Sequence, residues 1–297
     1  MIKTVTDFFK SKDVKYKEGV NLAAISPLHI GGLASIVAYP RTVEQLISIA
    51  GYLQKNEIPY KIIGRMTNIL FTAEKVVFVL VSTRYIKAAT FSDNVLHAEC
   101  GAFLPHLALL SAKLGLSGFE ELSGIPASVG GAVRSNAGAF GREISELISS
   151  VTVYDVASVN VIDLSPSECD FSYRHSAFTD NKKIVLSADF KLTHSEENVF
   201  LKINYYKQKR KETQPVGEHS IGSTFKRPVG AYAAEMIDRC GLKGRRVGGV
   251  KISEKHAGFM VNMGFGTAQD YLNLMEIARR AVYERFGVML ENEIEIF

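Results

Sequence analysis

The sequence predicts an α+β protein of about two domains, and three observations support this class. The first 115 residues alternate between strand and helix patterns, the middle third is rich in β-branched residues, and the last third carries amphipathic helical patterns. A typical domain has roughly 150 residues, so 297 residues suggest two domains and leave room for three small ones. The apolar content of 46% is enough for a substantial core.

In the first part of the chain, hydrophobic periodicity predicts a helix whose N-terminus is capped by Thr42, followed by strands and a second helix. In chain order these elements are a helix at 42–56, a strand at 58–63, a buried strand at 76–81, a strand at 95–100 and a helix at 104–114.

Segment 123–141 is rich in glycine, serine and alanine and is the strongest break in the pattern. Beyond it, strands precede helices, and we place a domain boundary near residue 200. Gly241 and Gly287 are predicted to end two of the helices. In chain order the elements are strands at 151–154, 159–164 and 184–192, helices at 196–213, 231–240 and 267–286, and a terminal strand at 293–297.

The net charge of +4 comes from the C-terminal part of the chain. Residues 204–251 contain 11 basic and 4 acidic side chains. A solvated helix face or a nucleic-acid patch could have this composition, but the aromatic side chains expected for single-strand binding are sparse. We therefore favour a pocket for a small polyanion such as a diphosphate.

Other features exclude several classes of protein. No apolar run approaches the roughly 20 residues of a membrane-spanning helix, and the N-terminus lacks the pattern of a secretory signal, which predicts a cytoplasmic protein. Cys100, Cys169 and Cys240 are widely spaced and odd in number, so we expect buried thiols without a disulfide framework or a zinc site. The histidines form no HxH or HxxxH pair, so no metal is predicted.

Two loops are candidates for holding a cofactor. Segment 123–141 could bring backbone amides close to an anion or a flat ring, because glycine has no Cβ. The loop Gly64–Asn68 follows a predicted strand and could present amides and the Thr67 and Asn68 side chains to a phosphate, although it is neither a P-loop nor a GxGxxG motif. Structural turns are the alternative for each loop alone. Together they suggest two loops that hold opposite sides of one dinucleotide.

Three short segments supply a cation, a hydroxyl group and a carboxylate. Arg174 lies in Ser-Tyr-Arg-His-Ser, Ser223 in Gly-Ser-Thr-Phe-Lys, and Glu293 in the terminal strand. This combination suits the reduction of an enolpyruvate, in which a carbanion is stabilised and then protonated. A surface ion pair, a turn serine and the solvent side of an edge strand are the alternatives. The local pattern fits Glu293 and Glu295 equally.

These segments, together with Leu28-His-Ile-Gly-Gly32 and the run Gly248–Asn262, make the chain resemble the UDP-N-acetylenolpyruvoylglucosamine reductases (MurB) of peptidoglycan synthesis. The resemblance implies a vanillyl-alcohol-oxidase/PCMH-type FAD-binding region followed by a smaller α+β substrate domain. The implied boundaries are 1–83 and 84–200 for two FAD-binding subdomains and 201–297 for the substrate-binding domain. Only 49 positions separate Arg174 from Ser223, which fits the subtype without an inserted tyrosine loop.

The resemblance also implies the reaction and its participants. FAD would be the cofactor, NADPH the electron donor, and UDP-N-acetylglucosamine enolpyruvate the substrate that is reduced to UDP-N-acetylmuramate. Arg174 and Glu293 would stabilise the enolate and Ser223 would protonate the adjacent carbon, with Glu293 rather than Glu295 at the family's acidic position. Neither nucleic acid nor a membrane is implied as a partner, no metal is implied, and a monomer is slightly favoured.

Further site residues follow from the same resemblance. The implied FAD-binding residues come from the two loops: Gly64, Arg65, Met66, Thr67, Asn68, Ile69, Ser123, Gly124, Ile125, Pro126, Ser128, Val129, Gly130 and Gly131. The implied substrate-binding residues are Tyr173, Arg210, Gln214, Arg227, Lys251 and His256.

The chain departs from the family pattern at several positions. Met66 replaces a glycine that approaches the cofactor, Ala127 stands where glycine is common, Ser135 stands where methionine is common, and Ser26-Pro-Leu replaces a threonine-bearing segment. Two alternatives therefore stay open. One is a catalytically silent relative that binds the UDP-sugar, and the other is a flavin oxidoreductase of the same fold that acts on another substrate.

Overall fold

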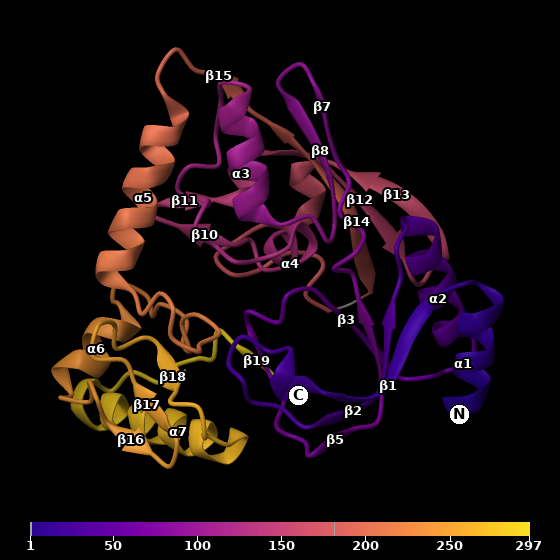
Figure 1. Ribbon diagram of the computed structural model, residues 1–297. Helices are drawn as coiled ribbons and strands as arrows, with labels where there is room; N and C mark the ends of the chain where they lie inside the picture. Colours follow the sequence, from indigo (N-terminus) through magenta and orange to yellow (C-terminus); the bar gives the residue numbers. More distant parts are fainter. Residues whose placement is uncertain (1, 181) are drawn as a thin grey trace. The chain divides into compact units, whose positions relative to one another are not determined.

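The computed structural model describes residues 2–180 and 182–297, which form two compact units (Figure 1). Unit 1 comprises Met1–Glu18, Ser35–Arg65 and Val77–Gln208. Unit 2 comprises Gly19–Ala34, Met66–Val76 and Lys209–Phe297. The chain thus passes between the units several times. The predicted three-part division with boundaries at 83 and 200 stays a prediction.

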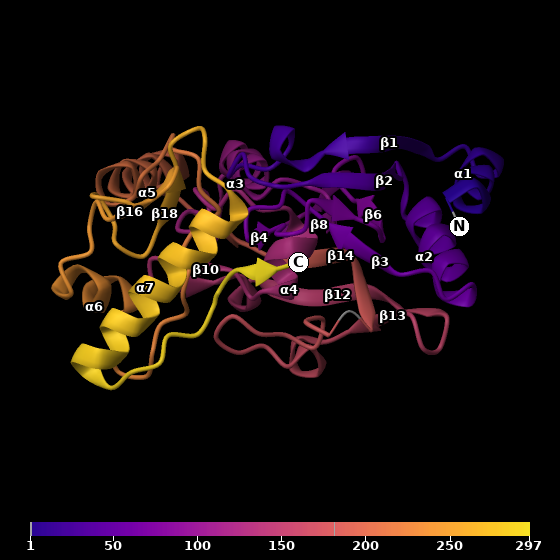
Figure 2. The ribbon, with the colours of Figure 1, turned by 90° about the horizontal axis from the view of Figure 1, so that it is seen from below.

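The first sheet has the strand order β1-β2-β6-β3, and β2 and β3 both run parallel to β6. Helices α1 and α2 lie together at the edge of unit 1 in both views (Figures 1 and 2), and the Phe8 and Tyr52 rings stack between them at 3.8 Å. The predicted cap is confirmed, because the Gln45 N–H donates to Thr42 Oγ1 at 3.3 Å. The elements are α1 (Ile2–Ser11), β1 (Lys15–Asn21), β2 (Leu33–Tyr39), α2 (Val43–Lys55), β3 (Tyr60–Ile63) and β6 (Val79–Ser82).

The second sheet of unit 1 is antiparallel, in the order β13-β12-β14-β8-β7. Helices α3 and α4 share its apolar core, in which Phe119 and Phe190 meet edge to face at 5.2 Å. The elements are β7 (Ala89–Ser92), β8 (Val95–Glu99), α3 (Leu104–Lys113), β9 (Leu116–Ser117), α4 (Val129–Arg134), β10 (Gly138–Ala139), β11 (Arg142–Glu143), β12 (Ile148–Asp155), β13 (Asn160–Leu164), β14 (Lys183–Lys191) and β15 (Thr193–His194).

Unit 2 is built around helix α7, whose buried face packs with α6 and a three-stranded sheet β16-β17-β18. Thr267 and Asp270 form a capping box at the start of α7, and Gly287 ends the helix with φ +69°, as predicted. The elements of unit 2 are β4 (Ile69–Leu70), β5 (Lys75–Val76), α6 (Ala233–Arg239), β16 (Arg246–Val247), β17 (Val250–Ile252), β18 (Met260–Asn262), α7 (Ala268–Phe286) and β19 (Glu295–Ile296). Helix α5 (Val199–Thr213) begins in unit 1, and its last residues belong to unit 2.

Three details differ from the sequence prediction. The run 76–81 is not one buried strand: it breaks between β5 and β6, where Val77 is 61% exposed. Segment 123–141, predicted as a loop, contains helix α4, because Gly130 lets the helix pack directly on Cys100. The terminal strand is short, and Glu293 precedes it. Of the three cysteines, Cys100 and Cys169 are buried as predicted, whereas Cys240 is only partly buried.

Among residues 2–180 and 182–297, no helix combines the length and the apolar character needed to cross a membrane.

Candidate functional site

Unit 1 contains a cavity of about 200 Å³ between strand β3, helix α4 and strand β14. Lys61, Arg134 and Lys183 line it, and none of the described lining residues is acidic. Three basic side chains in one lining make the cavity attractive to an anion. Gly64, Ser128, Gly130 and Gly131 also belong to the lining, so the structure joins residues from both predicted loops in one cavity.

The fit of a phosphate-bearing cofactor can be tested at Ser128. Its side chain is buried, and Oγ has no hydrogen-bond partner among the described residues. A Cβ on Gly64 would lie 2.3 Å from this oxygen. A buried hydroxyl without a partner is unfavourable, and a bound polar group would satisfy it. The lining cations, the Ser128 hydroxyl and the room left by Gly64 beside it therefore fit the diphosphate part of FAD.

Cys100 also lines the cavity, but its thiol is not a reactive nucleophile. Burial raises the pKa of its thiol to about 12, with the neighbouring Glu99 carboxylate as a smaller cause. The thiol is therefore neutral at physiological pH and is a poor nucleophile. Its role is packing: the Gly130 N–H donates to the Cys100 carbonyl at 2.8 Å, which brings α4 against β8.

The remaining residues of the two predicted loops do different things. Ser123 uses its hydroxyl locally, donating to the Glu120 carbonyl at 2.7 Å, and 123–127 form the turn that leads into α4. Arg65 is the last residue of the unit 1 segment Ser35–Arg65. Its guanidinium lies 3.8 Å from the centre of the Phe103 ring, which is a cation–π contact. Met66, Thr67, Asn68 and Ile69 belong to unit 2.

Arg174 occupies a tight turn of unit 1. Ser172 and His175 exchange backbone hydrogen bonds at 3.1 and 3.2 Å, leaving Tyr173 and Arg174 as a two-residue loop. Arg174 has φ +54°, which is the third-position conformation of a type II turn and favours glycine or asparagine. The guanidinium Nη2 donates to the Gly138 carbonyl at 3.2 Å and the group lies 5.0 Å from the Tyr173 ring centre.

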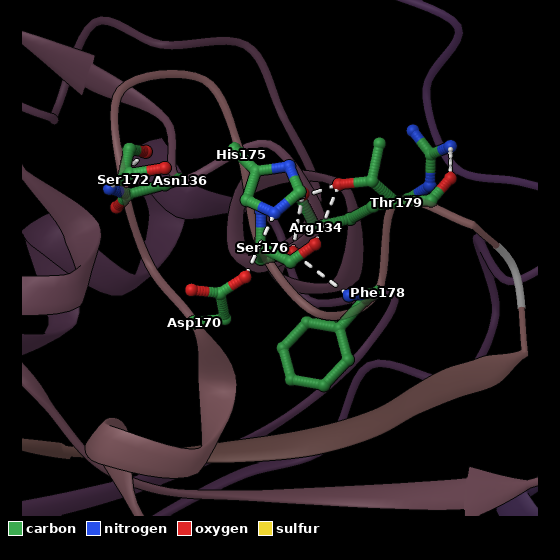
Figure 3. Close-up of polar contacts among 8 residues, drawn as sticks. All are labelled: Arg134, Asn136, Asp170, Ser172, His175, Ser176, Phe178 and Thr179. Atoms are coloured by element: carbon green, nitrogen blue, oxygen red, sulfur yellow. Dashed lines mark hydrogen bonds and ion pairs between the residues drawn. The ribbon is translucent and has the colours of Figure 1, made fainter.

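Polar contacts hold this turn on helix α4 and the residues that follow it (Figure 3). Asn136 Nδ2 donates to the Ser172 carbonyl at 3.0 Å. The buried Ser176 hydroxyl donates to the Arg134 carbonyl at 2.7 Å, and the His175 ring points to Asp170 at 3.2 Å. The α4 segment therefore contributes to the cavity and also braces the turn that carries Arg174.

Ser223 and Glu293 lie in unit 2, whereas Arg174 lies in unit 1. Gly222, with φ +87°, turns the chain just before Ser223. Among the described residues, the Ser223 hydroxyl makes no hydrogen bond, so it is available to a bound molecule. The Glu293 N–H donates to the Thr224 carbonyl at 2.9 Å, which places the glutamate beside the segment of Ser223.

Asn68 connects one predicted cofactor loop to the predicted carboxylate. Its Nδ2 donates to the Glu293 carbonyl at 3.0 Å, and its own carbonyl accepts from the Glu295 N–H at 2.9 Å. Glu295 lies in β19, parallel to β4, while Glu293 is paired with the Thr224 segment. The structure thus distinguishes the two acids, which the sequence pattern left equivalent.

Met66 precedes this junction with φ +54° and only 6% of its surface exposed. A non-glycine residue in this conformation carries strain of about 1–2 kcal/mol. This is the position at which the resemblance predicts glycine, and the backbone has kept the conformation that glycine prefers.

The predicted substrate-binding residues are divided between the units. Tyr173 lies in the Arg174 turn of unit 1, and the other five lie in unit 2. Arg210 near the end of α5 is half-buried, and desolvation of its guanidinium lowers its pKa to about 10. The Arg210 carbonyl accepts from the Gln214 N–H at 2.9 Å. Lys251 Nζ lies 3.9 Å from a Glu218 carboxylate oxygen.

The Arg227 guanidinium lies 4.8 Å from the Tyr232 ring centre on an exposed loop. His256 Nδ1 accepts from the Gly258 N–H at 3.1 Å, and burial lowers its pKa. Arg227 and Lys251 lie in the basic region 204–251 that the sequence identified, and His256 follows shortly after it.

Lys61, Arg134 and Lys183 were not predicted as cofactor residues. The signal in the sequence is weak: Lys61 is the one charged residue in an apolar strand, Arg134 follows the glycine pair, and Lys183 begins a strand. Only the folded arrangement shows that the three share a cavity.

Comparison with known proteins identifies the class to which this fold belongs. Residues 34–165 match the model of an FAD binding domain. The BBE-like 1 protein of Physcomitrella patens shares the fold over 64% of this chain, with a TM-score of 0.51 and 14% identity. The matched domain and the shared fold therefore define an FAD-binding protein.

The more specific matches cover both units. Residues 214–297 match the C-terminal domain of UDP-N-acetylenolpyruvoylglucosamine reductase. The reductase of Caldicellulosiruptor bescii is 36% identical over 97% of this chain and 92% of its own length, and that of Caldanaerobacter subterraneus is 41% identical over 90% and 88%. The crystal structure of the Thermus caldophilus enzyme (MurB) superposes with a TM-score of 0.79 at 33% identity, covering 96% of this chain and 98% of that one. The chain belongs to the UDP-N-acetylenolpyruvoylglucosamine reductase family.

Proposed function

We propose that this protein reduces UDP-N-acetylglucosamine enolpyruvate to UDP-N-acetylmuramate, with NADPH as electron donor, in peptidoglycan precursor synthesis. The observation that carries the proposal is the chain's similarity, over nearly its full length, to reductases named for this substrate. The three predicted catalytic residues are all present and lie in ordered, braced backbone. NADPH and nucleotide precursors are cytoplasmic metabolites, so we place the enzyme there.

Each side chain has a defined task in the proposed reaction. Bound FAD, reduced by NADPH, would be the source of the hydride that the methylene carbon of the enolpyruvyl group receives. The Arg174 guanidinium, with its permanent charge, would stabilise the negative charge that develops on the substrate carboxylate. Glu293 would assist Arg174 in stabilising the developing enolate.

Ser223 would complete the reaction by donating its proton to the carbon next to the carboxylate. The hydride and this proton saturate the double bond and convert the vinyl ether into a lactyl ether. A serine hydroxyl is a weak acid and needs favourable surroundings to transfer a proton. Lys226 and Arg227 follow Ser223 within four residues and supply positive charge near this segment.

For binding, we propose that Lys61, Arg134 and Lys183 surround the FAD phosphates and that Ser128 Oγ hydrogen-bonds to one of them. Arg210, Gln214, Arg227, Lys251 and His256, with Tyr173, remain the proposed substrate contacts. The basic character of the unit 2 residues suits the UDP diphosphate.

The test is spectroscopic. Purified protein should show a flavin absorption spectrum, lose it on anaerobic addition of NADPH, and regain it when the enolpyruvyl nucleotide is added. The Arg174→Ala and Ser223→Ala variants should bind FAD and be reduced by NADPH, but their flavin should stay reduced. Protein that is colourless and cannot be reconstituted with FAD would refute the proposal.

The same experiment separates the two alternatives. A catalytically silent relative would bind the nucleotide without reoxidising its flavin, and Met66 in the cofactor loop is the feature that favours it. A flavin oxidoreductase with another substrate would be reoxidised by a different acceptor and not by the enolpyruvyl nucleotide.

A further inference from the structure

Beneath Ser223 lies a hydrogen bond between two side chains that are closed off from solvent. Thr224 Oγ1 and the Tyr271 hydroxyl are 3.0 Å apart, and both residues are 0% exposed. Tyr271 comes from helix α7, in a cluster with apolar residues such as Leu274 and Ile294. Burial raises the pKa of Tyr271 well above its ordinary value, so the hydroxyl stays neutral.

Thr224 is connected to both proposed catalytic residues of unit 2. It follows Ser223 directly in the chain, and its carbonyl accepts from the Glu293 N–H at 2.9 Å. Its own N–H donates to the Gly258 carbonyl at 2.9 Å. A displacement of Thr224 would therefore move the proposed proton donor and the proposed acid together.

A buried polar pair is not needed for stability at this place. Replacing both partners of a buried hydrogen bond by apolar groups of the same shape is often close to neutral, whereas losing one partner leaves the other unsatisfied. The pair adds a geometric constraint, because a hydrogen bond fixes the distance and angle between Thr224 and Tyr271 of α7, whereas an apolar contact does not.

We propose that Tyr271 and Thr224 are positioning residues for the reduction: their hydrogen bond fixes the segment that places Ser223 and holds Glu293. The inference rests on the proposed function. It predicts that breaking the bond slows the step in which the substrate takes up hydride and proton, while FAD reduction by NADPH, which does not need Ser223, proceeds as before.

The test uses FAD-loaded protein and four variants: Tyr271→Phe, Thr224→Val, the double variant and Thr224→Ser. Two rates are measured anaerobically by stopped flow: flavin reduction by NADPH, and flavin reoxidation by saturating enolpyruvyl nucleotide. Urea unfolding gives the stability of each variant. Tyr154→Phe is the control, because Tyr154 is a buried tyrosine of unit 1 that contacts none of the proposed catalytic residues.

Each single variant should slow reoxidation about tenfold or more, since small misplacements of reacting groups reduce rates by up to about 100-fold. Flavin reduction by NADPH and the KM for the nucleotide should change less than about twofold, and reoxidation should show a larger solvent deuterium isotope effect. Thr224→Ser keeps the hydroxyl and should retain more of the rate than Thr224→Val. Tyr154→Phe should leave both rates unchanged.

The double variant is decisive. With no unsatisfied partner left, its stability should recover towards that of the wild type, yet reoxidation should stay slow. If reoxidation recovers together with stability, or if the single variants reoxidise within twofold of wild type, the pair has only a structural role and the inference is wrong. A wild-type protein that fails to reoxidise at all would instead overturn the proposed function, and the inference with it.

Discussion

The backbone of Arg174 offers a sharp test of whether a strained residue has been retained for its side chain. Its φ of +54° suits glycine, yet the position carries the proposed catalytic cation. Residues held in such conformations cluster at functional sites. We therefore compare two substitutions, Arg174→Ala and Arg174→Gly, which both remove the guanidinium but differ in the Cβ atom.

The magnitude follows from two opposing effects. A Cβ in the left-handed region costs about 1–2 kcal/mol, which glycine avoids. Glycine loses more chain entropy on folding, by about 0.5–1 kcal/mol relative to alanine. Arg174→Gly should therefore be more stable than Arg174→Ala by roughly 0–1.5 kcal/mol. Both variants lose the hydrogen bond to the Gly138 carbonyl and the contact with the Tyr173 ring, so these terms cancel.

The assay is urea unfolding at one saturating FAD concentration, because bound ligand adds to stability. The control is the same pair at Asn204, an exposed position within helix α5, where glycine should be less stable than alanine by about 1 kcal/mol. Turnover should fall by about 10²–10³ in both Arg174 variants. If glycine is less stable than alanine by the same amount at position 174 as at position 204, the backbone of Arg174 is not strained.

Three further changes have defined outcomes. Gly64→Ala places a methyl group 2.3 Å from a buried serine oxygen and should weaken FAD binding about tenfold in fluorescence titrations; unchanged affinity would place the phosphates elsewhere. Asn68→Ala removes the hydrogen bond to the Glu293 carbonyl, so it should lower the unfolding free energy by about 1 kcal/mol and slow substrate-driven flavin reoxidation. Reoxidation at the wild-type rate would show that this hydrogen bond does not position Glu293 for the reaction. The Thr267 N–H lowers the pKa of Asp270, so this carboxylate contributes stability above its unfolded pKa of about 3.9 and loses it as pH falls through the folded value. Asp270→Asn should therefore flatten the acid side of a plot of unfolding midpoint against pH, and an unaltered slope there would contradict the assignment.

Much of the secondary structure could be predicted from local pattern. The helices predicted at 42–56, 104–114 and 267–286 match α2, α3 and α7, since their apolar spacing and caps are strong local signals. The break inside 76–81 could not be foreseen, because Val77 is as apolar as its neighbours and its exposure is decided by the surrounding fold. Helix α4 was missed because glycines usually argue against a helix, and here they permit its close approach to Cys100.

The candidate site was predictable where residues stand in distinctive segments and not where they act as isolated charges. Arg174, Ser223 and the two loops were found from their sequence context and the resemblance it supports, and their proposed roles stay predictions. Lys61 and Lys183 belong to no motif, and a lysine in a strand is usually solvated, so only tertiary structure shows that they line the cavity. The contact of Asn68 with Glu293 spans 225 positions and has no local signal.

Met66 and Arg174 both have a backbone φ of +54°, which is strained for a residue with a Cβ atom. What offsets this strain differs between them, and the difference bears on whether Met66 disturbs the predicted cofactor loop. At Arg174 the turn is only partly buried, so we expect the proposed chemistry of the side chain to be the reason that the strain is kept. At Met66 the side chain is 6% exposed, and burying a methionine stabilises by about 1.5–3 kcal/mol, which matches or exceeds the 1–2 kcal/mol of strain. Burial of the Met66 side chain therefore offsets the strain of its backbone. Two residues later, the hydrogen bonds of Asn68 to the Glu293 and Glu295 backbone are formed. The departure that favours a silent relative therefore carries little net strain and leaves the Asn68 hydrogen bonds in place.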